Sequence, residues 1–323
     1  KEAFEELVRN SDVLVDNWGS GAFRRLGLGY DNLSQINPGL VYASITGYGD
    51  SPDLTGPYSD RPANNLAIQA MSGWMEITGD PDGVPQSVGD NIGDSIPGVW
   101  SALGIVLALE TKRKTGLGQY VDMAMYECMV SHIESNMNAY QATGSNPARS
   151  RDRNATAGIT FKAKDGYCVL AGVRTPTRMR DLWTLIGRED LLEGDSRYLA
   201  GPGMDGQFYT DHIIPAIEGW STDINKFQVA ATLTEIGFSM GVTQTVADLA
   251  NCPQLEARQM FVDTGDTLGG TFRGVRTPAR LTGCIDSPTE TAPTLGQHNS
   301  EILCSLGGMT SDEVIALEAE GAL

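Results

Sequence analysis

The stretch Gly93-Asp94-Ser95-Ile96-Pro97-Gly98 opens a long apolar run over 99–109. Serine is a frequent N-cap and proline suits a first turn, so the sequence predicts a helix over 96–113 with Ser95 as its N-cap. The run is apolar on nearly all sides, which predicts a buried helix, and the cations at 112–114 complement the negative end of its dipole. Asp94 is then a lone carboxylate at the opposite end, among backbone N–H groups that a helix leaves without partners. This placement suits a nucleophile.

Strands and helices alternate along the first half of the chain. Short buried or β-branched runs predict strands at 12–16, 40–46 and 119–123. Helical periodicity predicts helices at 1–9, 30–36 and 64–73, and a long helix that follows the third strand to about Tyr140. Such alternation is typical of an α/β fold with a mostly parallel sheet. We expect a Rossmann-like large domain over residues 1–150.

The pattern changes after residues 145–156, which are rich in arginine, contain Pro147 and are typical of a linker. Two apolar runs flank Lys164-Asp165-Gly166, which predicts a β-hairpin. Helical patterns follow near 177–186, 212–217 and 224–236. These elements predict a smaller α+β domain over 151–250, after which residues 251–323 are expected to return to the large domain.

Composition excludes several classes of protein. The formal net charge of −18, with no basic stripe to offset it, argues against a nucleic-acid partner. The five cysteines show no C-x-x-C spacing, so we expect neither a metal site nor a disulfide framework, and reduced thiols suit a cytoplasmic protein. No uninterrupted apolar stretch reaches the ~18 residues of a membrane span, so no membrane partner is expected.

The first nine residues are already in helical period. Phe4, Leu7 and Val8 share one stripe, and no capping residue stands before them. On this pattern we expect a further segment to precede Lys1.

A set of short segments, in fixed order over most of the chain, carries a family resemblance. The segments are Asp12-Val13-Leu14-Val15-Asp16-Asn17, Leu26-Gly27-Leu28-Gly29-Tyr30, Ile36-Asn37-Pro38, Tyr42-Ala43-Ser44-Ile45-Thr46-Gly47-Tyr48-Gly49, Gln69-Ala70-Met71-Ser72-Gly73, Gly93-Asp94-Ser95, Thr115-Gly116-Leu117-Gly118-Gln119 and Leu295-Gly296-Gln297-His298. In order and spacing they resemble the family III coenzyme A transferases, the group that includes formyl-CoA transferase and carnitine CoA-transferase. The resemblance implies a transferase acting on an acyl-CoA and a small carboxylic acid, and a homodimer of two interlocked ring-shaped chains.

The resemblance also implies a covalent mechanism in which Asp94 is the nucleophile. An aspartate of the family attacks the acyl-CoA thioester and carries CoA as an aspartyl-CoA thioester before the acceptor acid takes it over. Asp90 is the rival carboxylate, but no helix of its own begins there. The developing oxyanions need hydrogen-bond donors, and the backbone N–H groups at Ser95 and in the Gly47–Gly49 turn are the candidates.

Further site residues carry over from the resemblance. Coenzyme A contacts match Asn17, Trp18, Arg25 and Leu26, where the indole offers a flat face to the adenine and the guanidinium a fixed charge to a phosphate. The glycine-flanked turn, with Gly47 and Gly49, lets the backbone approach this substrate.

Two asparagines mark a departure from the known relatives. Racemases of the family place a histidine base at the position of Asn64, and an amide cannot take a proton from carbon. Formyl-CoA transferase has a tyrosine and a glutamate where this chain has Asn64 and Asn65. The two amides predict a more polar substrate pocket, suited to a larger or dicarboxylic acid. Two alternatives remain open: an acyl-CoA racemase or isomerase, and a non-catalytic CoA-binding partner subunit.

Overall fold

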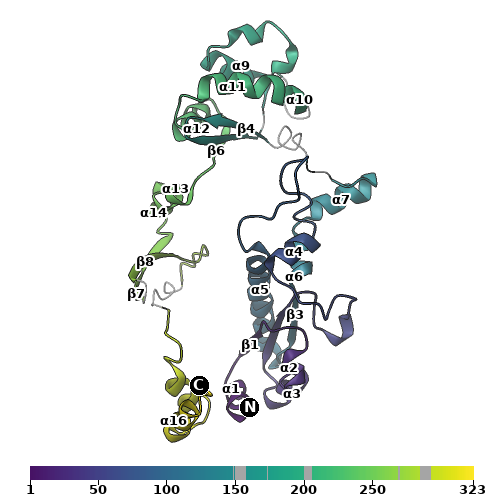
Figure 1. Cartoon of the computed structure of the whole chain (residues 1–323), viewed down its shortest axis with the longest axis vertical. Helices are drawn as coiled ribbons and strands as arrows, with labels where there is room; N and C mark the ends of the chain where they lie inside the picture. Colours follow the sequence, from purple (N-terminus) through teal and green to yellow (C-terminus); the bar gives the residue numbers. More distant parts are fainter. Residues whose placement is uncertain (148, 150–157, 173, 200–205, 268–269, 284–291) are drawn as a thin grey trace. The chain divides into compact units, whose positions relative to one another are not determined.

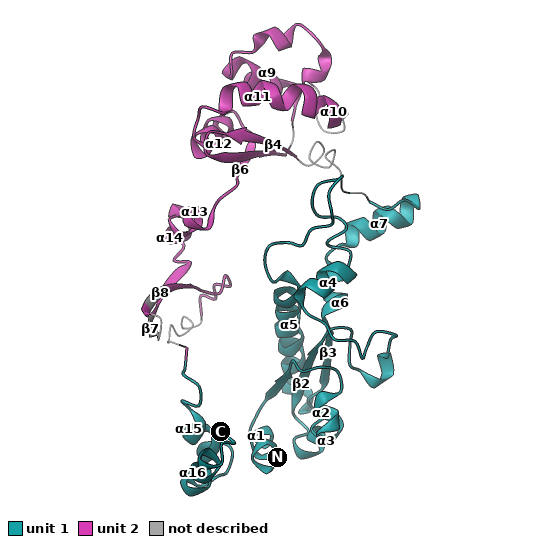
Figure 2. Ribbon diagram, in the orientation of Figure 1, with its two compact units in different colours: residues 1–149, 293–323 teal, residues 150–292 magenta. Residues whose placement is uncertain are grey.

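The computed structural model describes residues 1–147, 149, 158–172, 174–199, 206–267, 270–283 and 292–323 (Figure 1). The chain divides into two compact units, coloured separately in Figure 2. Unit 1 comprises residues 1–149 and 293–323, and unit 2 comprises residues 150–292. The chain thus leaves unit 1 close to residue 150 and returns to it at 293, later than the expected 251. Most of the predicted linker lies outside the described residues.

Unit 1 is built around a parallel sheet of three strands, β1 (Val13–Asp16), β2 (Val41–Thr46) and β3 (Tyr120–Ala124). The middle strand is β2, in which Tyr42 pairs with Leu14 on one side and with Tyr120 on the other. Because the strands run in the same direction, their carboxyl ends lie at one edge of the sheet. The predicted α/β class with a parallel sheet is confirmed.

Helices precede, connect and follow these strands (Figure 1). They are α1 (Glu2–Arg9), α2 (Ala22–Arg25), α3 (Tyr30–Ile36), the 3₁₀ turn η1 (Pro52–Leu54), α4 (Asn65–Met71), α5 (Ile92–Thr115), α6 (Met125–Ser131), α7 (Glu134–Thr143), α15 (Asn299–Ser305) and α16 (Ser311–Ala319). The two faces of the sheet differ because successive residues of a strand alternate. On one face Tyr42 packs with Val8 of α1 and Leu33 of α3. On the other, α5 lies so close to β3 that a Cβ at Gly104 would come within 3.0 Å of Cγ1 of Val121.

Helix α5 begins earlier than its sequence predicts. Asn91 is the N-cap, so Ser95 lies inside the helix and Pro97 is its sixth residue rather than part of its first turn. The reason is a cap from elsewhere in the chain: Oδ1 of Asn65 accepts a hydrogen bond from the Gly93 N–H at 2.9 Å. With that donor satisfied, the first turn forms without a capping side chain of its own.

The prediction that this helix is buried is wrong for the structure. Its buried residues are Gly93, Pro97, Ser101 and Ala108, whereas the exposed ones include Val99, Leu103, Val106 and Leu107. A helix that lies flat on a sheet presents one stripe to it, and here small residues form that stripe and allow close approach. By length and composition alone α5 could cross a membrane, but it packs against β2, β3, α4 and α6 of unit 1.

The long helix predicted up to Tyr140 is broken in two. α6 ends at Ser131 and α7 begins at Glu134. The Met129 carbonyl accepts the indole N–H of Trp74 at 3.0 Å and bonds to the N–H of His132, three residues on, instead of continuing the α-helical pattern. Tertiary contact therefore overrides the local helical preference at this point.

Unit 2 has an antiparallel sheet of β4 (Gly158–Ala163), β5 (Gly166–Ala171) and β6 (Ser239–Val242), with β5 in the middle. The predicted hairpin is confirmed as β4–β5. The helical elements of this unit are α9 (Pro176–Leu185), the 3₁₀ turns η2 (Glu189–Leu192) and η3 (Ser196–Leu199), α10 (Gly206–Phe208), the π-helical turn η4 (Tyr209–Ile213), α11 (Ile214–Ser221), α12 (Lys226–Glu235), α13 (Val246–Ala250) and α14 (Pro253–Ala257). A second hairpin, β7 (Phe261–Thr267) with β8 (Gly270–Val275), follows them.

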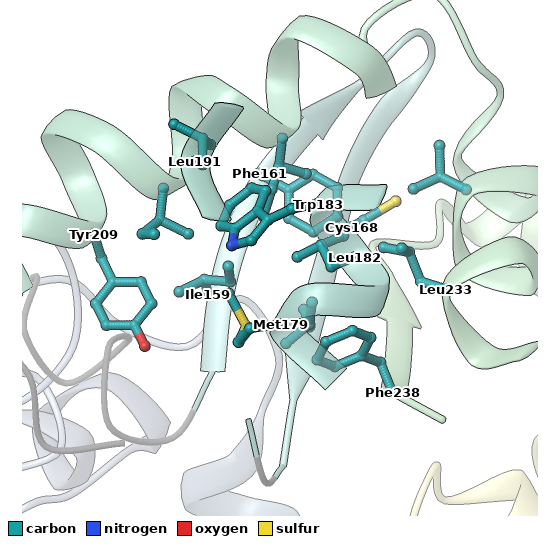
Figure 3. Close-up of a cluster of buried hydrophobic side chains, with 14 of the residues drawn as sticks. Ile159, Phe161, Cys168, Met179, Leu182, Trp183, Leu191, Tyr209, Leu233 and Phe238 are labelled. Atoms are coloured by element: carbon teal, nitrogen blue, oxygen red, sulfur yellow. The ribbon is translucent and has the colours of Figure 1, made fainter. Parts of the chain in front are cut away.

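The core of unit 2 gathers around Trp183 (Figure 3). This side chain is fully buried with Phe161 of β4 and Leu182 of α9, and its indole N–H donates to the Tyr198 carbonyl at 2.9 Å. Burial raises the pKa of Cys168, in the same cluster, to about 11, which keeps the thiol protonated at neutral pH. All four cysteines in the described part of the chain are free thiols.

Candidate active site

A cavity of about 580 Å³ opens at the carboxyl edge of the parallel sheet. It is lined by Asn17, Ala63, Asn64, Asn65, Leu66, Asp94 and Met125. Asn17 directly follows β1 and Met125 directly follows β3, so the strand ends bring two of these residues together. In open α/β sheets ligands bind in the crevice at the carboxyl ends of the strands, which is where this cavity lies.

Asp94 stands in the first turn of α5, as the third residue of the helix. Its side chain is exposed to the cavity, and within the described part of the chain no hydrogen bond or ion pair occupies its carboxylate. The position near the helix N-terminus favours a negative charge through the helix dipole. The group is therefore open to a substrate rather than committed to a structural contact.

Asp90, the rival carboxylate, has a different environment. Its Oδ1 accepts a hydrogen bond from the Asn91 N–H at 2.7 Å, and the residue is not part of the cavity lining. Asp90 shapes the turn that leads into α5. Asp94 is thus the carboxylate that the structure places toward the open space.

The backbone N–H groups at the start of α5 are already engaged. The N–H groups of Asp94 and Ser95 donate to the Asn91 carbonyl at 3.0 and 2.9 Å, and that of Gly93 donates to Asn65. The expectation that the Ser95 N–H is a free oxyanion donor is therefore wrong for this structure. An N-terminal turn that is satisfied internally has no donors left for a ligand.

The two asparagines of the predicted substrate pocket lie at the start of α4. Asn64 is the N-cap of that helix, and its Oδ1 accepts from the Ala67 N–H at 3.0 Å. Asn65 uses its Oδ1 for Gly93 and its Nδ2 to donate to Oδ1 of Asn91 at 3.2 Å. Both line the cavity, but the amide of Asn65 bonds to neighbouring parts of the chain, whereas no hydrogen bond of Nδ2 of Asn64 occurs among the residues that the structure describes.

The glycines of the turn after β2 are required by packing. A Cβ at Gly47 would come within 2.3 Å of the Ala63 Cβ, so the turn lies directly against a residue of the cavity wall. Gly49 has φ of 91°, a left-handed conformation that favours glycine, and its N–H donates to Oγ1 of Thr46 at 3.1 Å. The close approach that the sequence predicted is therefore to Ala63, and the Gly49 N–H is engaged within the turn.

The other residues matched to coenzyme A lie on exposed surface of unit 1. Trp18 follows Asn17 and is 60% exposed, with its ring edge-on to Phe23. Arg25 ends α2 and donates to the Ser20 carbonyl at 3.1 Å, and Leu26 is the C-cap of this helix. None of Trp18, Arg25 and Leu26 lines the cavity at Asp94. Of the predicted coenzyme contacts, the structure brings only Asn17 to the carboxylate.

A polar network that sequence reasoning missed fixes the loop after β2. Both carboxylate oxygens of Asp122 accept backbone N–H groups, from Asp50 at 2.9 Å and from Ser51 at 3.1 Å. The Asp50 carboxylate in turn pairs with Arg24 at 2.6 Å. The sequence signal for Asp122 was its place in a strand whose neighbours are apolar, since a carboxylate that is partly buried there needs hydrogen-bond donors.

Beside this network the sheet carries two neighbouring tyrosines, Tyr42, which is buried, and Tyr120, which is partly buried. Tyr42 donates its hydroxyl to Oδ2 of Asp16 at 3.1 Å, and burial together with that carboxylate raises the pKa of Tyr42. Burial also raises the pKa of Tyr120 to about 12. Both phenols are therefore neutral at physiological pH and support the sheet that carries the strand ends.

Comparison with known proteins identifies the family of this chain. The family described as CoA-transferase family III matches residues 1–299. A succinyl-CoA–D-citramalate CoA-transferase of Chloroflexus aurantiacus is 30% identical over 98% of this chain and 77% of its own length. A succinyl-CoA:mesaconate CoA-transferase of Haloarcula hispanica is 33% identical over 95% of this chain and 76% of its own length. A formyl-CoA:oxalate CoA-transferase of Streptomyces avermitilis is 31% identical over 100% of this chain and 81% of its own length.

A comparison with solved structures also finds a related protein with a similar fold. The crystal structure of a CaiB/BaiF family protein from Brucella suis superposes with a TM-score of 0.82, at 31% identity, over 94% of this chain and 78% of that one. Both the family match and these relatives extend across the parallel sheet and Asp94. The chain belongs to CoA-transferase family III.

Proposed function

We propose that this chain transfers coenzyme A between an acyl-CoA and a free carboxylic acid, with the Asp94 carboxylate as the nucleophile. One observation carries the proposal: the Asp94 carboxylate, in the first turn of α5, has no partner among the described residues and lines a cavity of about 580 Å³ at the carboxyl ends of the strands. Membership of the family supports the type of reaction.

The exchange proceeds through covalent intermediates on Asp94. The carboxylate attacks the thioester carbonyl of the donor, the C–S bond breaks, and a mixed anhydride and the CoA thiolate form. The thiolate attacks the aspartyl carbonyl, which releases the donor's carboxylate and leaves an aspartyl-CoA thioester. The acceptor carboxylate then displaces the thiolate from this thioester to give a second anhydride. Attack of the thiolate on the acceptor's carbonyl forms the new acyl-CoA and restores Asp94, with no net proton change.

Side-chain amides supply the donors for the oxyanions of these steps. The N–H groups at the start of α5 are engaged, whereas Asn17 and Asn64 both line the cavity. Because Oδ1 of Asn64 caps α4, its Nδ2 is the end that points a donor at a ligand. Loss of one such donor costs about 10²–10³-fold in kcat in enzymes that use them.

Exposed residues of unit 1 outside the cavity lining suit the adenine and phosphate groups of coenzyme A. Trp18 offers an exposed aromatic face. The guanidinium of Arg25 makes no ion pair with any residue that the structure describes, so it is available to a phosphate, whereas Arg24 is paired with Asp50. Leu26 adds apolar surface at the end of the same helix.

We infer that the acceptor is a dicarboxylic acid. The relatives from Chloroflexus and Haloarcula are named for succinyl-CoA with citramalate or mesaconate. The amide of Asn64 suits a second carboxylate better than an apolar side chain would, because it donates a hydrogen bond.

Racemisation is disfavoured by the same lining. Removal of an α-proton needs a base of suitable pKa, and no histidine lines the cavity. His132, for example, accepts the indole N–H of Trp100 at 3.0 Å outside it.

The reaction is tested by incubating the purified protein with succinyl-CoA and a panel of mono- and dicarboxylates, with mass spectrometry of the acyl-CoA products. We expect a new acyl-CoA from at least one dicarboxylate, and its loss in Asp94→Asn but not in Asp90→Asn. Deuterium uptake at the α-carbon without exchange of CoA would indicate the racemase instead. Binding of CoA without turnover of any acid would indicate a non-catalytic partner subunit.

We further propose that the protein acts in the cytoplasm as a homodimer. The exposed apolar side chains of α5 support an additional contact for unit 1, because a patch of Val99, Leu103, Val106 and Leu107 is costly to leave in water. An interlocked arrangement is the form that the family resemblance implies.

A further inference from the structure

Gln69 is a fully buried polar residue next to the site and belongs to no part of the reaction described above. It lies on α4, one turn after Asn65, so the two side chains share a face of the helix. Its amide makes three hydrogen bonds. Nε2 donates to Oδ1 of Asn65 at 2.9 Å and to the Asp90 carbonyl at 3.4 Å, and Oε1 accepts from the Val88 N–H at 2.9 Å.

These bonds fix the orientation of both amides. A backbone N–H can only donate, so the Val88 N–H requires Oε1 of Gln69 on its side. The Nε2 group must then face Asn65 and donate to its Oδ1. That same oxygen accepts from the Gly93 N–H, so each amide has only one orientation that satisfies its neighbours.

The bonds also connect α4 to the start of α5. Gln69 forms hydrogen bonds to Val88 and Asp90 in the loop before α5, and Asn65 forms hydrogen bonds to Asn91 and Gly93. These contacts surround the residues that directly precede Asp94. The start of α5 also lies in close contact with α4, because a Cβ at Gly93 would lie 2.8 Å from the Asn65 carbonyl oxygen.

We propose that Gln69 is a positioning residue for the nucleophile: through Asn65 and the loop at 88–90 it sets the first turn of α5 and thereby aims the Asp94 carboxylate into the cavity. The inference rests on the proposed role of Asp94. It explains why a buried amide stands behind a pocket that it does not line. A misplacement of about 1 Å of a catalytic group can cost about 10²-fold in rate, so a fixed first turn matters more for kcat than for binding.

The test compares Gln69→Met with Ser72→Ala in the intact protein. Methionine has a similar length and no amide, so it removes all three bonds at little change in volume. Ser72 is the control, because it is buried at the same end of α4, but its hydroxyl donates to backbone carbonyls of that helix, Ile68 at 2.7 Å and Gln69 at 3.4 Å, and not to the side-chain amide of Gln69. We expect Gln69→Met to lower kcat about 10- to 100-fold with KM for the acyl-CoA within about twofold. Ser72→Ala should leave both constants near those of the wild type.

Hydrogen exchange gives the second readout. In Gln69→Met, amides of residues 92–95 should exchange faster, while those of β2 and β3 stay protected. If Gln69→Met does not fold, Asn65→Ala, at a partly exposed position, should produce the same faster exchange and the same fall in kcat. An unchanged kcat, or a fall in kcat with unchanged exchange at 92–95, overturns the proposal. A fully active Asp94→Asn variant would refute the proposed function instead, whatever Gln69→Met does.

Discussion

Gly93, the residue before the nucleophile, has no room for a side chain. An added Cβ would lie 2.8 Å from the backbone oxygen of Asn65 and 2.9 Å from its Oδ1. We predict that Gly93→Ala forces α4 and α5 apart, destabilises the protein by about 1–3 kcal/mol, and lowers kcat more than it changes KM. Chemical denaturation and steady-state kinetics on one preparation measure the two effects.

Gly98 supplies the matched control on the same helix. Nothing lies within 4 Å of the Cβ that would be added there. Alanine is also favoured over glycine in a helix by about 0.5–1 kcal/mol, so Gly98→Ala should be neutral or stabilising. Equal losses in both variants would mean that the packing at Gly93 has no special role.

For individual residues, the sequence predicted which ones line the cavity but not what each side chain bonds to. The resemblance pointed to Asn17, Asn64, Asn65 and Asp94, and the structure brings all four to one cavity. What each amide does depends on donors and acceptors far along the chain. Oδ1 of Asn65 bonds to Gly93, for example, across 28 positions. No local pattern shows such a pairing, so the structural role of Asn65 and of Gln69 could not be predicted.

Helix α4 depends on the cap that Asn64 provides. Oδ1 of this side chain accepts the Ala67 N–H at 3.0 Å. We predict that Asn64→Ala destabilises the protein by about 1 kcal/mol, because the cap is lost, and also lowers kcat, because the amide donor is lost. Asn64→Asp keeps the cap but has no donor, so it should retain most of the stability and little of the activity. Thermal unfolding and kinetics of both variants separate the roles, and similar activity in Asn64→Asp and wild type would contradict the assignment of Asn64 as a donor.

Helices and strands follow from local sequence patterns where their own residues determine where they begin and end. Strands β1, β2 and β3, helix α3 and the hairpin β4–β5 lie within a residue or two of their predicted positions. The start of α5 and the break between α6 and α7 do not, because Asn65 and Trp74 from other elements determine them. The exposure of α5 could not be predicted either, because an apolar run does not show how many of its side chains other elements of the fold will cover.

Within unit 2, an ion pair between a buried lysine and a partly exposed aspartate makes stability depend on pH. Lys226 is almost fully buried and bonds to Asp248 at 2.6 Å, and this bond, with those from Thr245, lowers the pKa of Asp248 to about 2. An unfolded aspartate titrates near ~3.9, so the stabilisation is fully present above that pH and is lost as the pH falls through about 2. Asp248→Asn should lower the melting temperature at pH 7, and its difference from the wild type should shrink between pH ~4 and ~2.

Asp223→Asn is the control for this titration, because no ion pair of Asp223 occurs in the part of the chain that the structure describes. It should have little effect on the melting temperature at either pH. A difference between Asp248→Asn and the wild type that is the same at pH 7 and pH 2 would show that the charge of Asp248 does not contribute.

At the scale of the assembly, the exposed apolar side of α5 predicts a contact with another chain. We expect light scattering to give twice the mass of one chain. The double variant Leu103→Glu with Val106→Glu should shift this mass toward that of a monomer, because two charges would be buried without partners. A monomeric wild-type protein at micromolar concentration would contradict the proposed dimer.

The proposed mechanism requires a covalent bond to Asp94 during turnover. It is tested most directly by mixing the protein with succinyl-CoA, adding hydroxylamine, and sequencing the peptides by mass spectrometry. We expect a hydroxamate on Asp94, formed only when acyl-CoA is present, and no modification of Asp90. An unmodified Asp94 in a preparation that turns over the same acyl-CoA would contradict it.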